Sequence, residues 1–217
     1  MPLQVNKINY QKELEKLISQ LVEENKVPTL LIHSCCAPCS SYCLEYLSKY
    51  FKITVVYYNP NIFPLEEYEY RISEQKRLIE AMDFINPVEF IKTEYTPDDF
   101  YNEIKGLEKE AEGGKRCEKC FKLRLSYAAN LAKELKFDYF VTTLSISPMK
   151  DSTLLNTIGK SLEELYGVKY LPSDFKKKEG YKRSVELSKK YNLYRQDYCG
   201  CVYSKIETDR RKGVANS

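Results

Sequence analysis

A short apolar run leads into a cysteine-rich turn in the stretch Thr29-Leu30-Leu31-Ile32-His33-Ser34-Cys35-Cys36-Ala37-Pro38-Cys39-Ser40-Ser41. The apolar part follows Pro28 and is only a few residues long, which is typical of a buried strand. The residues from about Ser40 onward favour a helix. Three thiols therefore crowd the turn between a predicted strand and a predicted helix.

Outward from this turn, predicted strands alternate with predicted helices. The strands are 29–33, 51–58, 87–92, 138–143 and 168–171, and the helices are 9–25, 40–49, 65–82, one from the Thr96 cap, 117–136, 152–167 capped by Ser152, and 181–190. This alternation predicts an α/β fold, a parallel sheet with helices on both faces. Ligands bind such sheets beyond the carboxyl ends of the strands, and the cysteine-rich turn is one of the loops expected there.

The length allows one large domain. We predict a single α/β catalytic domain over 28–205, an N-terminal helix within 1–27 packed on it, and a basic C-terminal tail over 206–217. Met1 to Lys12 lacks the apolar core of a signal peptide, and no apolar run approaches the roughly 20 residues of a membrane span. These absences predict a cytoplasmic protein with no membrane partner, whose thiols stay reduced.

Eight cysteines in a reduced compartment point first to metal ligands or redox groups. Seven of them form three tight groups, and Cys43 alone is predicted to be a small buried apolar residue. The net charge is +3 but unevenly spread. Twelve Lys/Arg against five Asp/Glu give residues 176–217 a charge of +7, whereas 22 against 26 give the rest −4. That distribution suits a polyanion such as RNA, and equally an ordinary solvated helix face.

The thiol groups differ in what they can bind. Cys117 and Cys120 share one face of a predicted helix start, whose positive end favours thiolate. Cys199 and Cys201 flank a glycine, and these two pairs alone can build a four-thiolate zinc site. Cys35 and Cys36 are adjacent, so in extended backbone they are expected to point to opposite sides and to serve two centres. Four thiolates satisfy one iron–sulfur cluster, and the surplus indicates an active site.

Three other interpretations stay open on these residues. Cys36 and Cys39 resemble a thioredoxin-type redox pair, a phosphate-binding loop of the PP-loop type can occupy the same turn, and the metal can be structural zinc. For Cys39 we favour packing at the helix start. His33 is expected to be a satisfied core histidine and not a ligand, whereas Asp174 and Glu112 are candidate oxygen ligands or proton donors.

Six motifs, in order between about residues 28 and 205, make the chain resemble the QueH family of epoxyqueuosine reductases. They are Leu31-Ile-His-Ser-Cys-Cys-Ala-Pro-Cys-Ser40, Tyr58-Asn-Pro-Asn-Ile62, Glu112-Gly-Gly-Lys-Arg-Cys-Glu-Lys-Cys-Phe121, Thr142-Thr-Leu-Ser-Ile-Ser-Pro-Met-Lys150, Asp174-Phe-Lys-Lys-Lys-Glu-Gly-Tyr181 and Tyr194-Arg-Gln-Asp-Tyr-Cys-Gly-Cys201. One departure is visible, because Asp197 stands where an amide side chain is expected.

The resemblance implies a fold similar to the nucleotide α-hydrolase and PP-loop (HUP-like) group. It also implies an oxidoreductase that removes the epoxide oxygen of epoxyqueuosine in the anticodon loop of tRNA, the last step of queuosine biosynthesis. The cofactors it implies are a 4Fe-4S cluster and an additional mononuclear iron, without cobalamin. Other readings of the same residues are a zinc-stabilised tRNA-binding domain, which has no redox signal, and a PP-loop-type tRNA thiolase, which needs ATP.

On this basis each candidate residue receives an expected role. Cys117 and Cys120 are expected to bind the cluster, completed from Cys199 and Cys201 and from one of Cys35 and Cys36. The remaining thiols are expected to hold the second iron with Asp174, so that Cys35, Cys36 and Asp174 are the catalytic candidates. Tyr58, Asn59 and Tyr198 are expected to line the base pocket, and phosphate contacts are expected from Lys176, Lys177 and Arg183, with Lys178 and Lys182. The sequence does not identify the electron donor.

Overall fold

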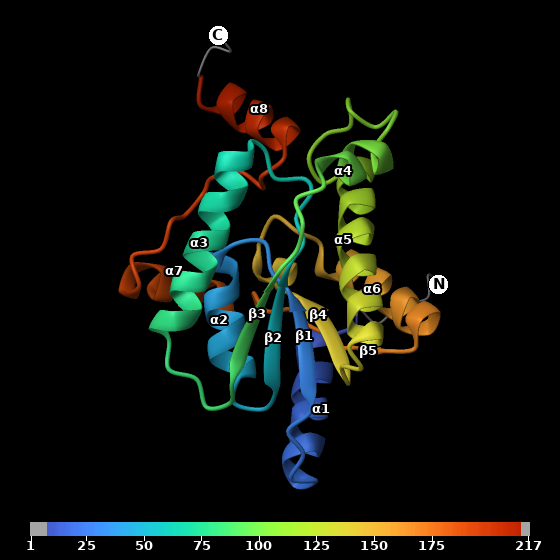
Figure 1. The fold of residues 1–217 in the computed structure, drawn as a ribbon, viewed down its shortest axis with the longest axis vertical. Coiled ribbons are helices and arrows are strands. Elements are labelled where there is room, and N and C mark those ends of the chain that lie inside the picture. The colour runs from blue at the N-terminus through green and yellow to red at the C-terminus, as the bar shows by residue number, and fades with distance from the viewer. Residues whose placement is uncertain (1–7, 214–217) are drawn as a thin grey trace, which may run out of the picture.

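The computed structural model describes residues 8–213 and contains one five-stranded sheet (Figure 1). Its strands are β1 (Thr29–His33), β2 (Lys52–Tyr57), β3 (Val88–Lys92), β4 (Tyr139–Thr142) and β5 (Lys169–Tyr170). The strand order is β3-β2-β1-β4-β5, and every neighbouring pair is parallel. The all-parallel sheet confirms the predicted fold class.

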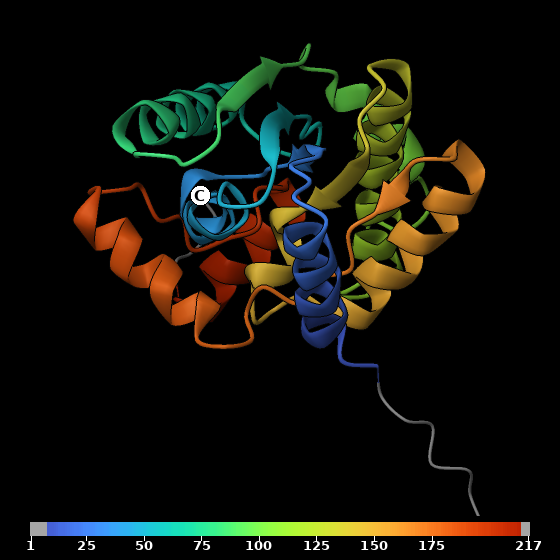
Figure 2. The ribbon, with the colours of Figure 1, turned by 90° about the horizontal axis from the view of Figure 1, so that it is seen from below.

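Helices cover both faces of the sheet. They are α1 (Tyr10–Glu23), α2 (Ala37–Leu47), α3 (Leu65–Ala81), α4 (Pro97–Glu103), α5 (Lys115–Glu134), α6 (Ser152–Tyr166), α7 (Gly180–Lys190) and α8 (Val202–Arg211), with a short 3-10 turn η1 (Thr143–Ile146). Because crossovers between parallel strands are right-handed, α2 and α3 lie on one face, with α7 against α2, and α5 and α6 lie on the other (Figure 2). Among residues 8–213 no helix is both long and apolar enough to cross a bilayer.

The centre of the sheet is the centre of the core. Leu30, Leu31 and Ile32 of β1 have no exposed surface, and burial of each such side chain stabilises the fold by roughly 1.5–3 kcal/mol. The chain leaves β1 toward β2 on one side, whereas β4 lies on the other side of β1. The turn after β1 therefore lies at the switch in strand order, where α/β sheets bind ligands.

Three differences from the predicted elements exceed small shifts of their ends or change a predicted cap. Helix α2 begins at Ala37, not near Ser40, because Cys36 serves as its N-cap residue and Pro38 fits the first turn. The cap of α6 is Asp151, whose carboxylate accepts from the Thr153 amide, so Ser152 is already helical. Helix α8 was not predicted, and it runs across the predicted boundary between the domain and the tail. Residues 1–7 and 214–217 of the two predicted terminal segments lie outside the described residues.

Candidate metal centre

The turn after β1 gathers three thiols, Cys35, Cys36 and Cys39, which we call the turn thiols. The Sγ atoms of Cys35 and Cys36 are 3.8 Å apart, and the Sγ atoms of all three lie within 4.8 Å of one another. The backbone bends at Cys35 and passes directly into the first turn of α2, so the alternation of an extended chain is lost. The expectation that Cys35 and Cys36 point apart is therefore wrong, and Cys39, expected only to pack, joins them. This group can hold a metal ion.

The turn thiols share protons unequally. Hydrogen bonds from the thiols of Cys35 and Cys39 hold the pKa of Cys36 well below the ordinary thiol value, although burial opposes this. Hydrogen bonding to Cys35 and then to Cys36 raises the pKa of Cys39. Hydrogen bonding to Cys36 raises the pKa of Cys35. Cys36 is also the residue at the N-terminus of α2, where the helix dipole favours an anion. Cys36 is thus the most acidic thiol of the group.

A buried polar network fixes this turn from behind. His33 accepts or donates at both ring nitrogens, with Nδ1 2.9 Å from Thr142 Oγ1 and Nε2 3.1 Å from the Tyr58 carbonyl oxygen. Burial lowers its pKa to about 4, so the ring is neutral near pH 7. The hydroxyl of Ser34 donates to Gln75 Oε1 at 2.8 Å, and Ser40 donates to the same oxygen at 2.7 Å. His33 is therefore a satisfied core histidine, as predicted.

The remaining four thiols of the three groups, Cys117, Cys120, Cys199 and Cys201, lie at the start of α5 and just before α8, and we call them the outer thiols. Cys120 and Cys201 pack together with Phe100 and Ile104 in one apolar cluster. Burial raises the pKa of Cys120 to about 12, and the negative charge of Cys199 and Cys201 adds to this effect. Burial and the same two neighbours, which outweigh the Gly113 amide, raise the pKa of Cys117. The two segments that carry the outer thiols therefore meet in space.

Gly200 makes the close spacing of Cys199 and Cys201 possible. Its φ of +126° is strained for any residue with a Cβ, and an added Cβ would lie 2.9 Å from Ile62 Cγ1 and 3.1 Å from Arg71 Nη1. The glycine thus lets the chain turn tightly against α3 while its two cysteine neighbours face different surroundings.

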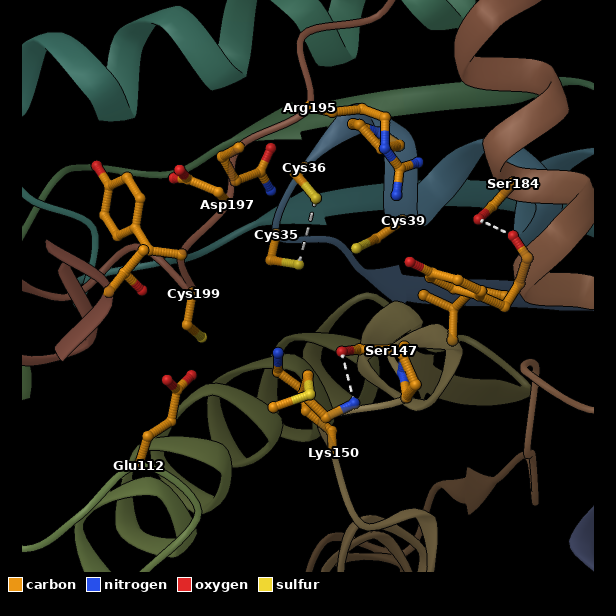
Figure 3. A pocket seen from close by; sticks show the side chains of 18 of the residues that line it. Cys35, Cys36, Cys39, Glu112, Ser147, Lys150, Ser184, Arg195, Asp197 and Cys199 are labelled. Carbon is orange, nitrogen blue, oxygen red and sulfur yellow. Dashed lines mark hydrogen bonds between the residues drawn. The ribbon is translucent and has the colours of Figure 1, made fainter. Parts of the chain in front are cut away.

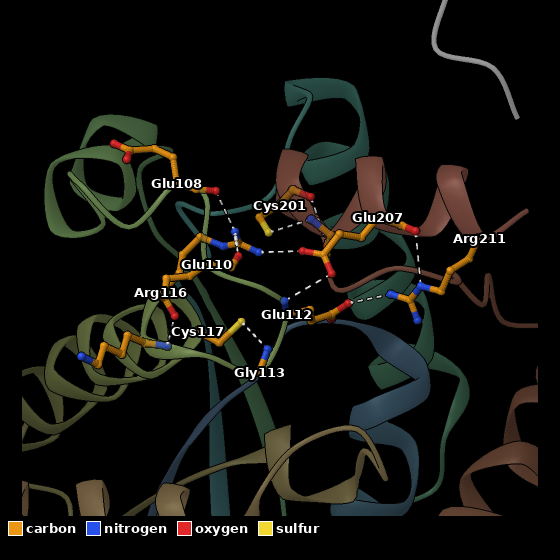
Figure 4. Close-up of polar contacts among 11 residues, drawn as sticks. Glu108, Glu110, Glu112, Gly113, Arg116, Cys117, Cys201, Glu207 and Arg211 are labelled. Atoms are coloured by element: carbon orange, nitrogen blue, oxygen red, sulfur yellow. Dashed lines mark hydrogen bonds and ion pairs between the residues drawn. The ribbon is translucent and has the colours of Figure 1, made fainter. Parts of the chain in front are cut away.

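A set of ion pairs joins the loop before α5 to α8, and we call it the clamp (Figure 4). The buried guanidinium of Arg116 donates to Glu207 Oε1 at 3.1 Å and to the carbonyl oxygens of Glu108 and Glu110. Glu207 also accepts from the Glu112 amide at 3.2 Å, and Arg211 donates to the Glu112 carboxylate at 3.2 Å. The clamp holds the α5 cysteines beside the C-terminal ones.

A cavity of about 370 Å³ opens beside the turn thiols (Figure 3). Cys199 reaches it from the C-terminal segment, so this cavity brings the three turn thiols and one outer thiol to one surface. The carboxylates that line it are Glu112 and Asp197, which pair with Arg211 and Lys212 respectively. The other polar side chains of the lining are Ser147, Lys150, Tyr181, Ser184, Arg195, Gln196, Tyr198, Thr208 and Arg211.

Several predicted site residues lie elsewhere. Of the three residues expected to line the base pocket, only Tyr198 lines this cavity. Tyr58 is buried and stacks on Tyr127 with ring centroids 3.9 Å apart, and Asn59 is buried with its amide donating to the Ser34 carbonyl oxygen at 2.8 Å. Both residues instead contact α5, Tyr58 through Tyr127 and Asn59 through Arg124.

Asp174 is separated from the turn thiols. Its carboxylate bonds the Lys176 ammonium at 2.6 Å, and both line a second cavity of about 320 Å³ with Lys177, next to the start of α6. Lys150 lines both cavities. Arg183 lies on α7, where Glu45 and Glu186 pair with it at 2.7 Å and 3.0 Å. Lys178 and Lys182 pair with Glu15 and Glu179.

Sequence reasoning missed the cations that surround the thiols. Arg71 and Arg124 have 1% and 0% of their surface exposed, and Lys150 lines the cavity beside the turn thiols. Burial would lower the pKa of Lys150, but Cys199, Cys35 and Cys39 raise it above its ordinary value. Arg71 and Arg124 each lie on a helical face with apolar neighbours. A charged residue on a buried helical face is the signal that could have found them.

The matching family model and the similar proteins of known name agree on one family. Residues 30–207 match the family described as epoxyqueuosine reductase QueH. Proteins of that name from Streptococcus pyogenes serotype M1 and Staphylococcus epidermidis are 44% and 45% identical to the chain. The alignments cover 91% and 93% of this chain and 78% and 86% of those proteins.

Among solved structures, a predicted subunit of tRNA methyltransferase from Methanocaldococcus jannaschii aligns with a TM-score of 0.48 at 15% identity. That alignment covers 74% of this chain and 76% of the other.

Proposed function

This chain belongs to the epoxyqueuosine reductase QueH family, and from that premise we propose how it acts. The reaction is the reductive removal of the epoxide oxygen of epoxyqueuosine in tRNA, which leaves the alkene of queuosine. Both C–O bonds of the epoxide break, a C=C bond forms, and the oxygen leaves as water. The balance requires two electrons and two protons.

The donor set fits an iron–sulfur cluster with a second iron close by. Three turn thiols lie within 4.8 Å of one another, Cys199 lines the same cavity, and Cys120 and Cys201 pack together beside Cys117, whereas one tetrahedral zinc needs about four ligands. Buried guanidinium nitrogens of Arg71 and Arg124, without hydrogen-bond partners among the described residues, add positive charge that suits an anionic group. When bound, these metals would supply electrons and a Lewis acid for the epoxide oxygen.

The packing suggests how the thiols divide. We assign Cys117, Cys120 and Cys201 to the cluster, because Cys120 and Cys201 share one apolar cluster and Cys117 lies a turn from Cys120. One of Cys35 and Cys36 completes the four. The remaining turn thiols and Cys199, which line the cavity, are assigned to the second iron. Asp174 leaves this set because its carboxylate pairs with Lys176 in the other cavity.

The cavity is the proposed entry for the modified base. Tyr198 offers an aromatic face and Ser147, Ser184 and Arg195 offer hydrogen bonds to the base. For the RNA backbone we propose Lys176 and Lys177 in the neighbouring cavity, across Lys150. The charge of Arg183 is already matched by two carboxylates, which makes it a weaker phosphate contact. A reduced-thiol site of this kind belongs in the cytoplasm, and the electron donor is unidentified.

The convergence of the three turn thiols within 4.8 Å is the observation that carries the metal assignment. The test is anaerobic reconstitution with iron and sulfide, metal and sulfide analysis, and turnover with tRNA that carries epoxyqueuosine. We expect visible charge-transfer absorption, more iron than one cluster requires, and queuosine as product. A matched sample loaded with zinc alone should be colourless and inactive. Full activity of the zinc sample would refute the redox assignment, and a requirement for ATP would favour a thiolase.

A further inference from the structure

Arg124 is a fully buried cation with no carboxylate partner among residues 8–213. Its Nε donates to the Cys120 carbonyl oxygen at 3.4 Å, its Nη1 donates to Asn59 Oδ1 at 3.2 Å, and its buried Nη2 has no hydrogen-bond partner in the part of the chain described. The other two buried arginines differ, because Arg71 pairs with Glu67 and Arg116 with Glu207. Arg124 thus bonds only neutral oxygens.

A buried charge of this kind needs a counter-charge, because desolvation of an unpaired ion strongly destabilises a fold. The candidates around Arg124 are thiols. Arg124 bonds the Cys120 carbonyl oxygen directly and reaches the Ser34 carbonyl oxygen, next to Cys35, through Asn59. Cys120 is an outer thiol and Cys35 is a turn thiol. The guanidinium therefore lies between the segments that carry the two groups.

Asn59 fixes the guanidinium in this position. Its Oδ1 accepts from Arg124, while its Nδ2 donates to the Ser34 carbonyl oxygen, one residue before the turn thiols. The side chain of Arg124 also bonds the carbonyl of Cys120, one helical turn earlier on α5. Arg124 is thus bonded directly to the segment that carries Cys120 and, through Asn59, to the segment that carries Cys35.

Resting on the iron–sulfur site proposed above, we infer that Arg124 is the built-in counter-charge of the cluster and raises its reduction potential. A cluster held by four thiolates is anionic and gains one further negative charge on reduction. A fixed positive charge nearby in a low-dielectric interior stabilises the reduced state more than the oxidised state. Arg124 is accordingly a positioning residue that makes electron uptake easier, and it does not touch the substrate.

The test is a potentiometric titration of the reconstituted full-length protein, followed by EPR of the reduced cluster. Arg124→Gln removes the charge and keeps an amide, so the midpoint should shift to a more negative potential. Arg124→Lys keeps the charge and should stay close to the wild-type midpoint. Arg183→Gln is the matched control, because Arg183 lies on α7 with two carboxylate partners, and its midpoint should not change.

A second variant protects the test from a folding defect in Arg124→Gln. Asn59→Asp leaves Arg124 in place but puts a carboxylate on its Nη1, which neutralises the charge and should also lower the midpoint. Unchanged midpoints in Arg124→Gln and Asn59→Asp, with iron and sulfide content equal to wild type, would overturn the inference. If Arg124→Gln takes up no cluster, Asn59→Asp alone tests the inference: a lowered midpoint potential supports it and an unchanged one overturns it. A wild-type protein that shows no cluster signal would instead overturn the proposed cofactor.

Discussion

The turn thiols and the outer thiols, which we propose as two halves of one centre, are built in different ways. Cys35, Cys36 and Cys39 lie within five consecutive residues that lead from the end of a buried strand into the first turn of a helix, and the local backbone brings them together. The outer thiols come from α5 and from the segment before α8, which are distant in sequence and are joined by the clamp. The first half is set by local geometry, whereas the second depends on tertiary contacts.

This difference predicts different behaviour without metal. The turn is held by His33, Ser34 and Ser40 through buried hydrogen bonds that involve no thiol ligand. The outer half relies on ion pairs that include partly exposed residues, such as Glu207 with 30% of its side chain exposed. Loss of metal should therefore loosen the outer half first.

The largest expected effect comes from removing one thiol of each half. Cys36→Ala and Cys117→Ala should each lower deoxygenation by more than the roughly 10–100-fold lost when a residue that only orients a metal ligand is removed. Iron content and turnover of the reconstituted proteins measure this. Cys43→Ala is the control, because Cys43 is buried in the core and its thiol bonds only the Cys39 carbonyl. Retention of activity in either of the first two variants would remove that thiol from the centre.

The stability of the folded protein should depend on pH through His33, which supports the turn. The ordinary imidazole pKa of 6.5 falls to about 4 on burial, so between these values the unfolded chain binds a proton that the folded chain does not. Stability is therefore fully present above pH 6.5 and falls as the pH decreases toward 4, on the order of 3 kcal/mol in total. Urea denaturation of the metal-free protein across this range measures the slope.

His33→Gln separates this contribution from the carboxylates, which titrate in the lower part of the same range. The variant should be less stable at pH 7 and should show a flatter pH dependence between 6.5 and 5. A slope equal to that of the wild type would mean that His33 is protonated in the folded protein.

The clamp offers a smaller effect, confined to the outer half. Glu207→Gln leaves the Arg116 guanidinium, with 2% of its side chain exposed, without its carboxylate. We expect a loss of about 1–3 kcal/mol in the free energy of unfolding and faster loss of iron to a chelator. Glu186→Gln breaks the pair with Arg183, in which the side chains of Glu186 and Arg183 are 49% and 42% exposed. It should lower the free energy of unfolding by less than about 0.5 kcal/mol. Equal iron loss in the two variants would show that the clamp does not support the outer thiols.

The smallest effect concerns the RNA. Lys177 is exposed beside the second cavity, so Lys177→Ala should weaken tRNA binding a few-fold and reduce the slope of log K against log salt by about 0.7. Binding measured by fluorescence anisotropy at several salt concentrations gives this slope. Arg183→Ala, whose charge is already matched, should change the slope less. An unchanged slope in Lys177→Ala would move the RNA away from this cavity.

The sequence predicted the local half of the centre better than the assembled half. The apolar run of β1 and the Pro38 turn are local signals, and they located the strand, the helix and three of the thiols. The adjacency of Cys35 and Cys36 led to the wrong prediction that their side chains point to opposite sides, because a single bend at Cys35 cancels the alternation of an extended strand. Helix α8 was not predicted, because its segment is rich in Lys and Arg and its helical face buries few apolar side chains.

Other features of the site were beyond the sequence for a tertiary reason. Asp174 carries the right chemistry, but the strand order places it beyond Lys150, in contact with Lys176. Arg124 lies among the apolar positions of the buried face of α5, but a basic residue on a long helix is ordinarily solvated, so its charge alone did not single it out. Only the packing of α5 against the sheet and the turn shows that its charge is enclosed.

The burial of His33 also limits which groups can supply the protons of the reaction. The chain has one histidine, and its two ring nitrogens are engaged by Thr142 and the Tyr58 carbonyl in a neutral, buried ring. Imidazole is the side chain that ordinarily exchanges protons near neutral pH, so the two protons that leave in water must come from other groups at the cavity or from solvent. Treatment with a histidine-selective acylating reagent should then leave turnover intact, as expected for a reductase that works without an imidazole acid.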